Sequence, residues 1–332
     1  GQRNVLDANP DYFEGRPYID RYMYRIIPDN STMYMELKAG GIDMMGLTPV
    51  QYQRQTVTNE FLSRFSKYRY PASSYVYLGY NLRHPLFSDK RVRKAITAAI
   101  NKEEIIHGVL FGMGQPAHGP FKPGTWAENP RQSDIPYDPN LSSKLLAEAG
   151  WREKNRDGIL VRNGKPFQFT ILTNQGNDVR LKTAQIIQQR LKLIGIDIRI
   201  RVVEWASLLS HFIDKGNFEA LVMGWTISPD PDLYDVWHSS KTGPKELNFI
   251  GYRNVEVDRL IEQARGTFDQ EKRKQSYYRI QEILVDEQPY TFLYVPDALP
   301  VVSSRFRGVE PSPAGISHNI IKWYVPKEEQ IH

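Results

Sequence analysis

Cysteine is absent from all 332 residues of the chain. Its absence excludes disulfide bonds, thiolate nucleophiles and cysteine-based zinc sites, although it leaves the redox compartment open. No apolar run approaches the roughly 18 residues that a membrane-spanning helix needs. The chain begins GQRNVLDANP, without an initiator methionine or a signal peptide, so we expect it to be mature, truncated or both.

The sequence also lacks the short motifs of several enzyme classes. It contains no HExxH, no GxSxG, no Walker phosphate loop and no dinucleotide-binding glycine pattern. The stretch NRDG at 155–158 begins like a calcium loop, but the bidentate glutamate of such a loop does not follow, so the stretch predicts a hairpin turn. These absences favour a binding protein without metal or cofactor over an enzyme.

The composition predicts a folded protein with room for two domains. Hydrophobic residues make up 40% and charged residues 24% of the chain, as in ordinary globular proteins. The net charge is +5, but the basic residues alternate with acidic or apolar ones. This spacing predicts a diffusely basic surface rather than a nucleic-acid interface.

The middle of the chain alternates between strand and helix patterns. We expect strands at 171–173, 196–202 and 218–225, and helices at 180–194, 205–216, 89–100, 101–110, 140–150, 255–265 and 270–288. The order β-α-β-α-β predicts an α/β sheet, in which ligands collect beyond the carboxyl ends of the strands. Two extended segments, 75–81 and 290–295, bracket this region and predict paired crossings between two lobes.

The stretch GWTISPDPDLYDVWHSS at 224–240 follows the third of these strands. Pro229 and Pro231 fix the backbone, so its acids lie in a rigid loop, where binding groups are common. We interpret the stretch as a wall that faces a ligand. Its candidate ligand-binding residues are Trp225, Thr226, Ser228, Asp230, Asp232, Trp237 and His238.

Structural alternatives stand beside these candidates. The two tryptophans are also typical of a hydrophobic core. The acids are also typical of turns and of a helix cap near Leu233, a role that fits Asp232 better than Asp230. His238 is also typical of a structural histidine. A metal-dependent hydrolase that uses Asp230, Asp232 and His238 is the lesser alternative to a binding site.

Two further places supply candidates. The stretch HGPFKPGTW at 118–126 contributes His118, Phe121 and Trp126, with an ordinary surface loop as the alternative. Arg180, at the start of a predicted helix, has the planar fork that binds a ligand carboxylate, with a solvated side chain as the alternative.

The order of several segments resembles a known family. The most specific segment is YLGYNLRHPLFSDKRVRKAITAAINKEEII at 77–106, supported by LLAEAGW, GIDIRIRVVEW, FEALVMGW, NFIGYRNVEVDRLIEQAR and WYVP. Together they resemble the extracytoplasmic solute-binding proteins of family 5, which serve ABC importers of dipeptides, oligopeptides and nickel. The resemblance covers nearly the whole chain.

The resemblance implies a periplasmic-binding-protein-like α/β fold of type II, with two lobes that close on a ligand. Residues 1–76 then form the later segment of lobe I, residues 77–297 form lobe II, and residues 298–332 return to lobe I. The early part of lobe I is missing. In peptide-binding members an aspartate three residues after the Gly-Trp tryptophan binds the peptide amino terminus. Ser228 stands there, so we expect Asp230 or Asp232 to replace it.

The resemblance also implies a function and a location. We expect a protein that captures dipeptides or oligopeptides between its lobes and delivers them to ABC permease subunits in the membrane. A carrier of a nickel complex or another small solute is the alternative. The protein is then a monomer, periplasmic or at the cell surface, with a lipid anchor as a further possibility.

Overall fold

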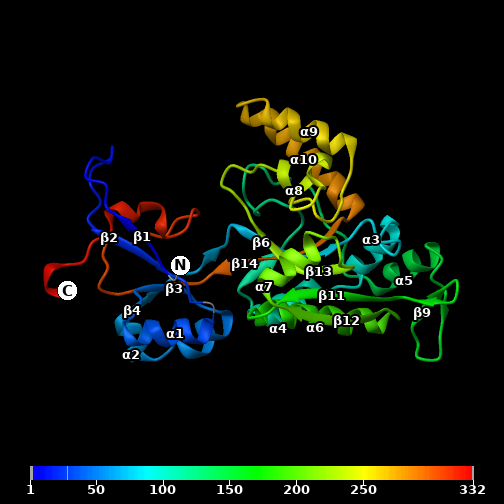
Figure 1. Cartoon of the computed structure of the whole chain (residues 1–332), viewed down its shortest axis with the longest axis horizontal. Helices are drawn as coiled ribbons and strands as arrows, with labels where there is room; N and C mark the ends of the chain where they lie inside the picture. Colours follow the sequence, from blue (N-terminus) through cyan, green and yellow to red (C-terminus); the bar gives the residue numbers. More distant parts are fainter. Residues whose placement is uncertain (1–2, 28, 331–332) are drawn as a thin grey trace. The chain divides into compact units, whose positions relative to one another are not determined.

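The computed structural model describes residues 3–27 and 29–330, and the chain divides into two units (Figure 1). Unit 1 combines Gly1–Ala72 with Asp297–His332, and unit 2 is Ser73–Pro296. The boundaries expected from the sequence, 76/77 and 297/298, lie close to these. None of the helices in the described part of the chain is long and apolar enough to cross a membrane.

Unit 2 is built on one mixed sheet. The strand order is β12 (Asp197–Val203), β11 (Gln168–Asn174), β13 (Ala220–Thr226), β6 (Ser74–Tyr80) and β14 (Tyr290–Ala298), with the short β7 (Gly114–Pro116) also pairing with β14. β11 is parallel to β12 and β13, whereas β6 is antiparallel to β13 and β14. The end of β14 lies beyond Pro296 and pairs with β5 (Tyr70–Pro71) of unit 1.

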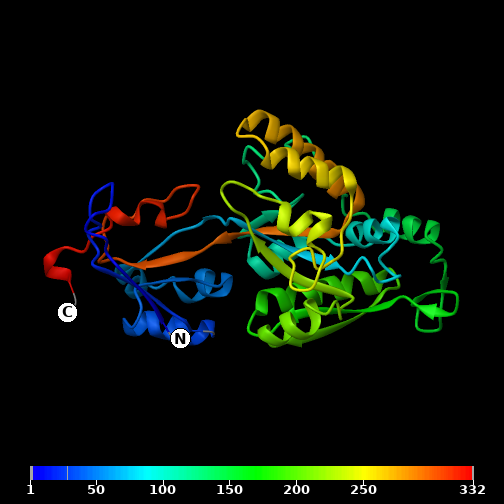
Figure 2. The same ribbon diagram turned by 45° about the horizontal axis from the view of Figure 1, so that its top comes forward.

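Helices pack on both faces of this sheet and bury its alternating apolar side chains in two cores. The first core lies under α3 (Lys90–Ala98), α4 (Lys102–Leu110), α5 (Pro139–Glu148) and α6 (Asp178–Leu193). The second lies under α8 (Tyr234–Trp237), α9 (Val255–Arg265), α10 (Gln270–Glu287) and the segment 205–213. Figure 2 shows α9 and α10 side by side as a helical hairpin.

One predicted helix differs from the structure. Instead of a single helix over 205–216, the chain forms a short α7 (Trp205–Ser207) followed by a π-helix (Leu208–Ile213). The Glu204 carboxylate caps α7 by accepting from the backbone N–H groups of Ala206 and Ser207, both at 2.9 Å. The wider π-helical turn still buries Leu208 and Ile213 in the second core, so the apolar pattern is satisfied.

The connections make β11 and β13 a topological switch point. The chain leaves β11 through α6 on one face and reaches β12, then returns through 205–213 on the other face to β13, on the opposite side of β11. β11 and β13 pair at only two positions, Ile171 with Ala220 and Leu172 with Leu221. Their carboxyl ends therefore separate. In open α/β sheets, ligands bind beyond the strand ends at such a switch point.

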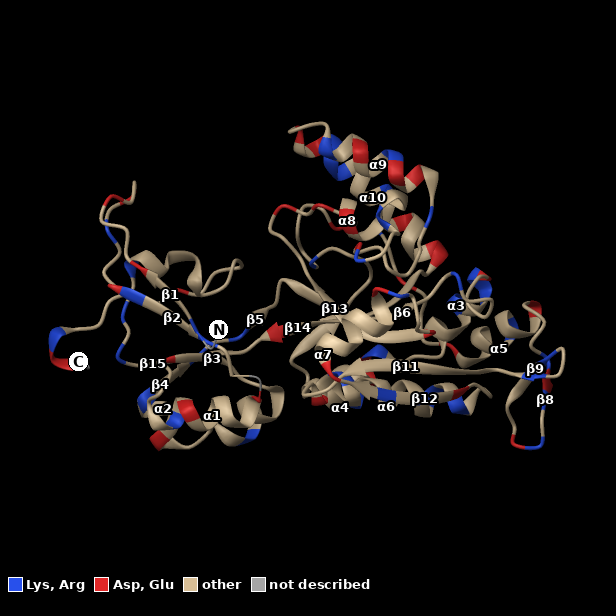
Figure 3. Cartoon of the chain, viewed as in Figure 1, with Lys and Arg blue, Asp and Glu red and all other residues tan. Residues whose placement is uncertain are grey.

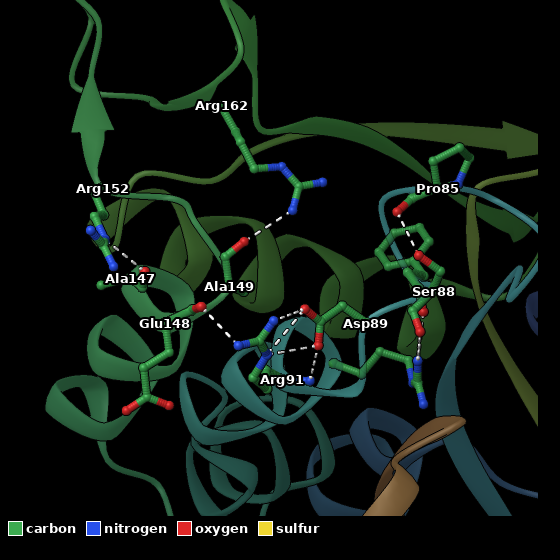
Figure 4. A network of polar contacts seen from close by, with 11 residues as sticks. Pro85, Ser88, Asp89, Arg91, Ala147, Glu148, Ala149, Arg152 and Arg162 are labelled. Carbon is green, nitrogen blue, oxygen red and sulfur yellow. Dashed lines mark hydrogen bonds and ion pairs between the residues drawn. The ribbon is translucent and has the colours of Figure 1, made fainter.

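Three arginines close the carboxyl end of α5 (Figure 4). They come from α3, from the residue before β8 (Glu153–Lys154) and from β9 (Leu160–Arg162). Cations there satisfy carbonyls that have no partner within the helix. Each guanidinium donates to a backbone carbonyl: Arg91 to that of Glu148 at 2.8 Å, Arg152 to that of Ala147 at 3.0 Å and Arg162 to that of Ala149 at 3.0 Å.

The hairpin turn predicted at 155–158 is confirmed. The Gly158 N–H donates to the Asn155 carbonyl, and the Asn155 side chain accepts from the N–H groups of Asp157 and Ile159. These bonds occupy the Asn155 oxygen within the turn. The turn joins β8 to β9, which also pairs with β10 (Lys165–Pro166).

Unit 1 has two small sheets. β1 (Arg3–Asp7) and β2 (Arg21–Arg25) form an exposed ribbon, while β3 (Met44–Gly46), β15 (Pro300–Ser303) and β4 (Phe65–Lys67) form a second sheet. The helices are α1 (Asn30–Ala39), the π-helix Gln51–Gln55, α2 (Asn59–Arg64) and the 3₁₀ turns Ser317–Lys322 and Lys327–Glu329. Figure 3 shows basic and acidic residues interspersed along both units.

Candidate ligand-binding site

Arg180 lies between the separating ends of β11 and β13, beside Asn174, Met223 and Gly224. It sits in the first turn of α6, where its backbone N–H donates to the Asn177 side chain that caps the helix. Its guanidinium donates to the Asn174 side chain at 2.8 Å and lies 3.7 Å from the Met223 sulfur. Burial lowers the pKa of Arg180, because desolvation disfavours the charged form.

No carboxylate pairs with Arg180 among the residues that the structure describes. The nearby phenols of Tyr294 and Tyr77 raise its pKa only as smaller, opposing effects. A desolvated cation without a counter-ion is costly in free energy, and an anion that binds next to it removes that cost. The planar guanidinium also suits two parallel bonds to a carboxylate. The Arg180 guanidinium therefore has the chemistry to bind an anion.

Gly224 makes room for this guanidinium. A side-chain Cβ at position 224 would lie 2.9 Å from the Tyr75 carbonyl oxygen and 3.4 Å from Arg180 Nη2. Only glycine therefore keeps both β6 and Arg180 where they are. Beyond Gly224, Thr226 and Ser228 are exposed, and their contact with a ligand stays a prediction.

Trp225 lies near the end of β13, and its side chain is half-buried among other aromatic rings. Its ring lies nearly parallel to Tyr77, with 6.5 Å between the ring centroids, and 5.9 Å from Phe249. The indole N–H donates to the Tyr290 hydroxyl at 3.3 Å. Burial raises the pKa of Tyr290 to about 12, so the phenol stays protonated and fixed in this stack. Trp225 is thus held rigidly, with part of its surface left for a ligand.

The acids of the following loop, residues 227–233, are paired within unit 2. Asp230 forms an ion pair with Arg273 of α10 at 2.6 Å. Asp232 accepts from the Tyr234 N–H at 3.0 Å and lies 3.2 Å from Arg265 at the end of α9. Asp232 therefore has the turn role that its position indicates.

The stretch at 118–126 meets the same helix α10. The Trp126 ring packs on Tyr277 at 5.6 Å and lies beneath the Arg273 guanidinium at 5.2 Å. Phe121 is buried against the other side of Tyr277, with 5.2 Å between the rings. The part-buried His118 accepts a bond at its backbone carbonyl from Gln281 of α10.

Two α10 residues join these loops, Arg273 and Tyr277, and neither was among the site residues expected from the sequence. Arg273 binds Asp230, and the Tyr277 hydroxyl donates to the Pro231 carbonyl at 2.6 Å. Their spacing of four residues places them on one face of a helix, which is the only signal in the sequence that groups them.

Comparisons with known proteins agree with this fold. The family described as bacterial extracellular solute-binding proteins, family 5 Middle, matches residues 1–246. The chain belongs to this family. It is 39% identical over 331 residues to the oligopeptide-binding protein AppA of Bacillus subtilis (strain 168), covering 98% of this chain and 60% of AppA.

Solved structures of family-5-like proteins match as well. The structure of AppA from Bacillus subtilis in complex with a nonapeptide is 38% identical with a TM-score of 0.85, covering 98% of this chain and 64% of AppA. NikZ from Campylobacter jejuni in complex with Ni(L-His) is 25% identical with a TM-score of 0.86, and the match covers 97% of this chain and 65% of NikZ. The chain thus spans less than two thirds of the length of these relatives.

Three predicted site residues lie in the core instead. Trp237 is fully buried, with its ring 4.8 Å from Tyr290, because it falls on the inner face of α8. The buried His238 ring bonds Ser240 at 2.8 Å and Glu262 at 3.3 Å. Phe121 is also buried. The side chains of Trp237, His238 and Phe121 are thus enclosed by the protein, and a ligand contact of these three residues stays a prediction.

The acids and the histidine of the hydrolase alternative do not converge. Asp230, Asp232 and His238 each bind a different partner, Arg273, Arg265 and Glu262 respectively. Within residues 3–27 and 29–330, no three His, Cys, Asp or Glu side chains form a group that would hold a metal ion. Asp230, one of the two acids expected to replace the family aspartate, forms an ion pair with Arg273 while its own side chain stays 70% exposed.

Proposed function

We propose that the protein is the substrate-binding component of an ABC importer and captures dipeptides or oligopeptides. The observation that carries the proposal is Arg180, a half-buried guanidinium at the switch point with no carboxylate partner in the described residues. Every unmodified peptide ends in a carboxylate, which matches this fork in charge and shape. The half-buried Trp225, on the neighbouring strand β13, offers apolar area to a peptide side chain.

The relatives support a peptide as the ligand. AppA of Bacillus subtilis is described as oligopeptide-binding, and its structure holds a nonapeptide. DppA from Helicobacter pylori, 28% identical with a TM-score of 0.82, holds the peptide STSA. Membership of a solute-binding family also favours binding over catalysis, and we propose that the protein is not an enzyme.

A nickel complex is the second candidate. NikZ is solved with Ni(L-His), and histidine also carries a carboxylate that would fit Arg180. Its metal would then be part of the solute, held by the ligand rather than by a cluster of protein side chains.

The lobe assignment completes the proposal. Unit 2 corresponds to lobe II, and unit 1 carries the later segments of lobe I, with 72/73 and 296/297 as hinge points. Ligand contacts from two lobes would favour a closed state that ABC permease subunits bind. The family is extracellular, so we place the protein in the periplasm or at the cell surface, as a monomer with or without a lipid anchor.

The test is calorimetric titration of the protein as its gene encodes it, with a peptide and its carboxyl-terminal amide. We choose the peptide by mass spectrometry of solutes that co-purify from cells. Amidation and Arg180→Gln should each weaken binding about tenfold or more, because charge-assisted bonds contribute roughly 1.5–3 kcal/mol.

The matched control is Lys182→Gln, an exposed cation on the same helix, which should leave affinity unchanged. Binding of Ni²⁺ with L-histidine, but of no peptide, would favour the second candidate. Equal affinity for the acid and the amide would contradict the role of Arg180.

A further inference from the structure

Arg273 of α10 lies between two loops that are far apart in the sequence. On one side its Nη2 donates to Asp230 of loop 227–233 at 2.6 Å. On the other side its guanidinium lies 5.2 Å from the centre of the Trp126 ring in loop 118–126. The Arg273 side chain is 16% exposed and the Asp230 side chain 70%, so the acid reaches inward to a largely enclosed cation. The bond to Asp230 is the main cause that raises the pKa of Arg273.

Tyr277, one turn further along α10, repeats the same arrangement. Its hydroxyl donates to the Pro231 carbonyl at 2.6 Å and accepts from Arg273 at 3.0 Å. Its ring packs on Trp126 and on Phe121. One face of α10 therefore holds both loops with aromatic contacts on one side and polar contacts on the other.

A second ion pair holds the same loop from α9. Arg265 lies 3.2 Å from Asp232, and its guanidinium covers the Tyr234 ring at 4.4 Å. Because α9 and α10 pack against each other, both arginines belong to one rigid hairpin. Loop 227–233 thus has both of its carboxylates occupied by arginines of this hairpin.

We propose that Arg273 is a positioning residue that holds loops 118–126 and 227–233 together as one ligand-facing wall, and that Asp230 contacts Arg273 rather than the ligand. This inference rests on the proposed peptide-binding function. It deepens that function by stating the ligand class, because loop 227–233 then offers no free carboxylate to an amino terminus. Unit 2 recognises a peptide by its anionic end, and peptides with a blocked amino terminus bind as well as free ones.

The first test is a thermodynamic cycle that combines one change in the peptide with one substitution in the protein. A peptide and its N-acetyl form are titrated calorimetrically against the wild type and against Asp230→Asn. We expect acetylation to change affinity less than threefold in both proteins. A loss of tenfold or more on acetylation in the wild type that disappears in Asp230→Asn would overturn the proposal, since it would show that Asp230 reads the amino terminus.

The second test reverses the charges of the pair. Asp230→Asn and Arg273→Gln should each weaken peptide binding about threefold to tenfold, and the double variant Asp230→Arg with Arg273→Asp should bind better than Arg273→Asp alone, because it restores the ion pair but not the contact with Trp126. Arg273→Lys keeps the charge but lacks the flat surface over Trp126, so it should fall between wild type and Arg273→Gln. The control is Arg279→Gln, also on α10, which removes an exposed ion pair with Glu256 of α9.

The third test needs no ligand and separates this inference from the proposed function. Hydrogen exchange is measured for Asp230→Asn, and we expect faster exchange in the other loop, 118–126, with protection in α6 unchanged. Unchanged exchange in 118–126 would overturn the coupling of the loops. If no peptide binds the wild type, the proposed function fails, but this measurement still decides whether Arg273 joins the two loops.

Discussion

The Arg180 guanidinium donates to the Asn174 side chain at 2.8 Å and meets no carboxylate among the described residues. Asn174 ends β11, and Arg180 begins the helix that follows it, so the strand-to-helix turn fixes the direction of the cation. A neutral partner orients the guanidinium without neutralising it. The charge therefore remains for a ligand, which is the physical basis of the proposed function.

Replacing Gly224 tests the space around Arg180. Gly224→Ala should destabilise the protein by about 1–3 kcal/mol, as overpacking does, because the new Cβ meets the Tyr75 carbonyl. It should also weaken binding by displacing the guanidinium. Denaturant unfolding and calorimetric titration measure the two effects. Gly46→Ala, at a glycine with open space around it, is the control, and equal effects of both substitutions would contradict the close packing.

The two tryptophans of the 224–240 stretch should respond differently to truncation. Trp237→Ala removes a fully buried ring and should cost about 3–5 kcal/mol of unfolding free energy. Compared with Trp237→Ala, Trp225→Ala should cost less unfolding free energy but lower ligand affinity more, since the Trp225 ring is only half-buried and part of it is open to a ligand. Urea titration and ligand titration of both variants check this, and a larger loss of affinity in a still-folded Trp237→Ala would reverse the assignment.

His118 should make stability depend on pH. Burial and, to a lesser degree, Lys102 lower its folded-state pKa below the ordinary value of 6.5. The unfolded chain therefore binds a proton at a pH where the folded chain does not. Stability falls as the pH drops from about 6.5 towards the lowered folded pKa.

The measurement is the free energy of unfolding between pH 8 and pH 5, compared for wild type and His118→Gln. The variant should show a smaller loss in acid. His107→Gln, at an exposed histidine on α4, is the control and should follow the wild type. Parallel curves for wild type and His118→Gln would contradict the lowered pKa.

Unit 2 should fold without unit 1. A fragment of residues 73–296 contains both cores of the mixed sheet, so we expect one cooperative thermal transition followed by circular dichroism. A fragment that ends at residue 268 loses both α10 and strand β14, which contribute to the two cores, and should lack this transition. Non-cooperative unfolding of 73–296 would show that the two units depend on each other.

Much of unit 2 follows from sequence periodicity. The alternation at 196–202 and the helical spacing at 180–194 predicted β12 and α6, because burial of one face dictates period 2 or 3.6. The single helix over 205–216 was wrong, since the same apolar spacing fits the π-helical turn that the structure contains. Periodicity identifies buried faces better than it identifies the hydrogen bonding of a short helix.

The site was less accessible from the sequence. Asp230 and its partner Arg273 are 43 residues apart, and only the packing of α10 on the loop brings them together. Whether a carboxylate is free or paired depends on such contacts. That Arg180 binds a ligand carboxylate stays a prediction, and the sequence does not show that its side chain is half-buried between β11 and β13.

β6 and β14, the strands that carry the chain into and out of unit 2, are antiparallel neighbours in one sheet. On the other side of the boundary, Pro71 and Asp297 of unit 1 are also paired. The two segments of unit 1 therefore end next to each other, so that a short turn could join residue 72 to residue 297. Unit 2 is an insertion with adjacent ends, which is the arrangement that lets a module be exchanged, or its ends be moved to a surface turn such as 155–158, without altering its core.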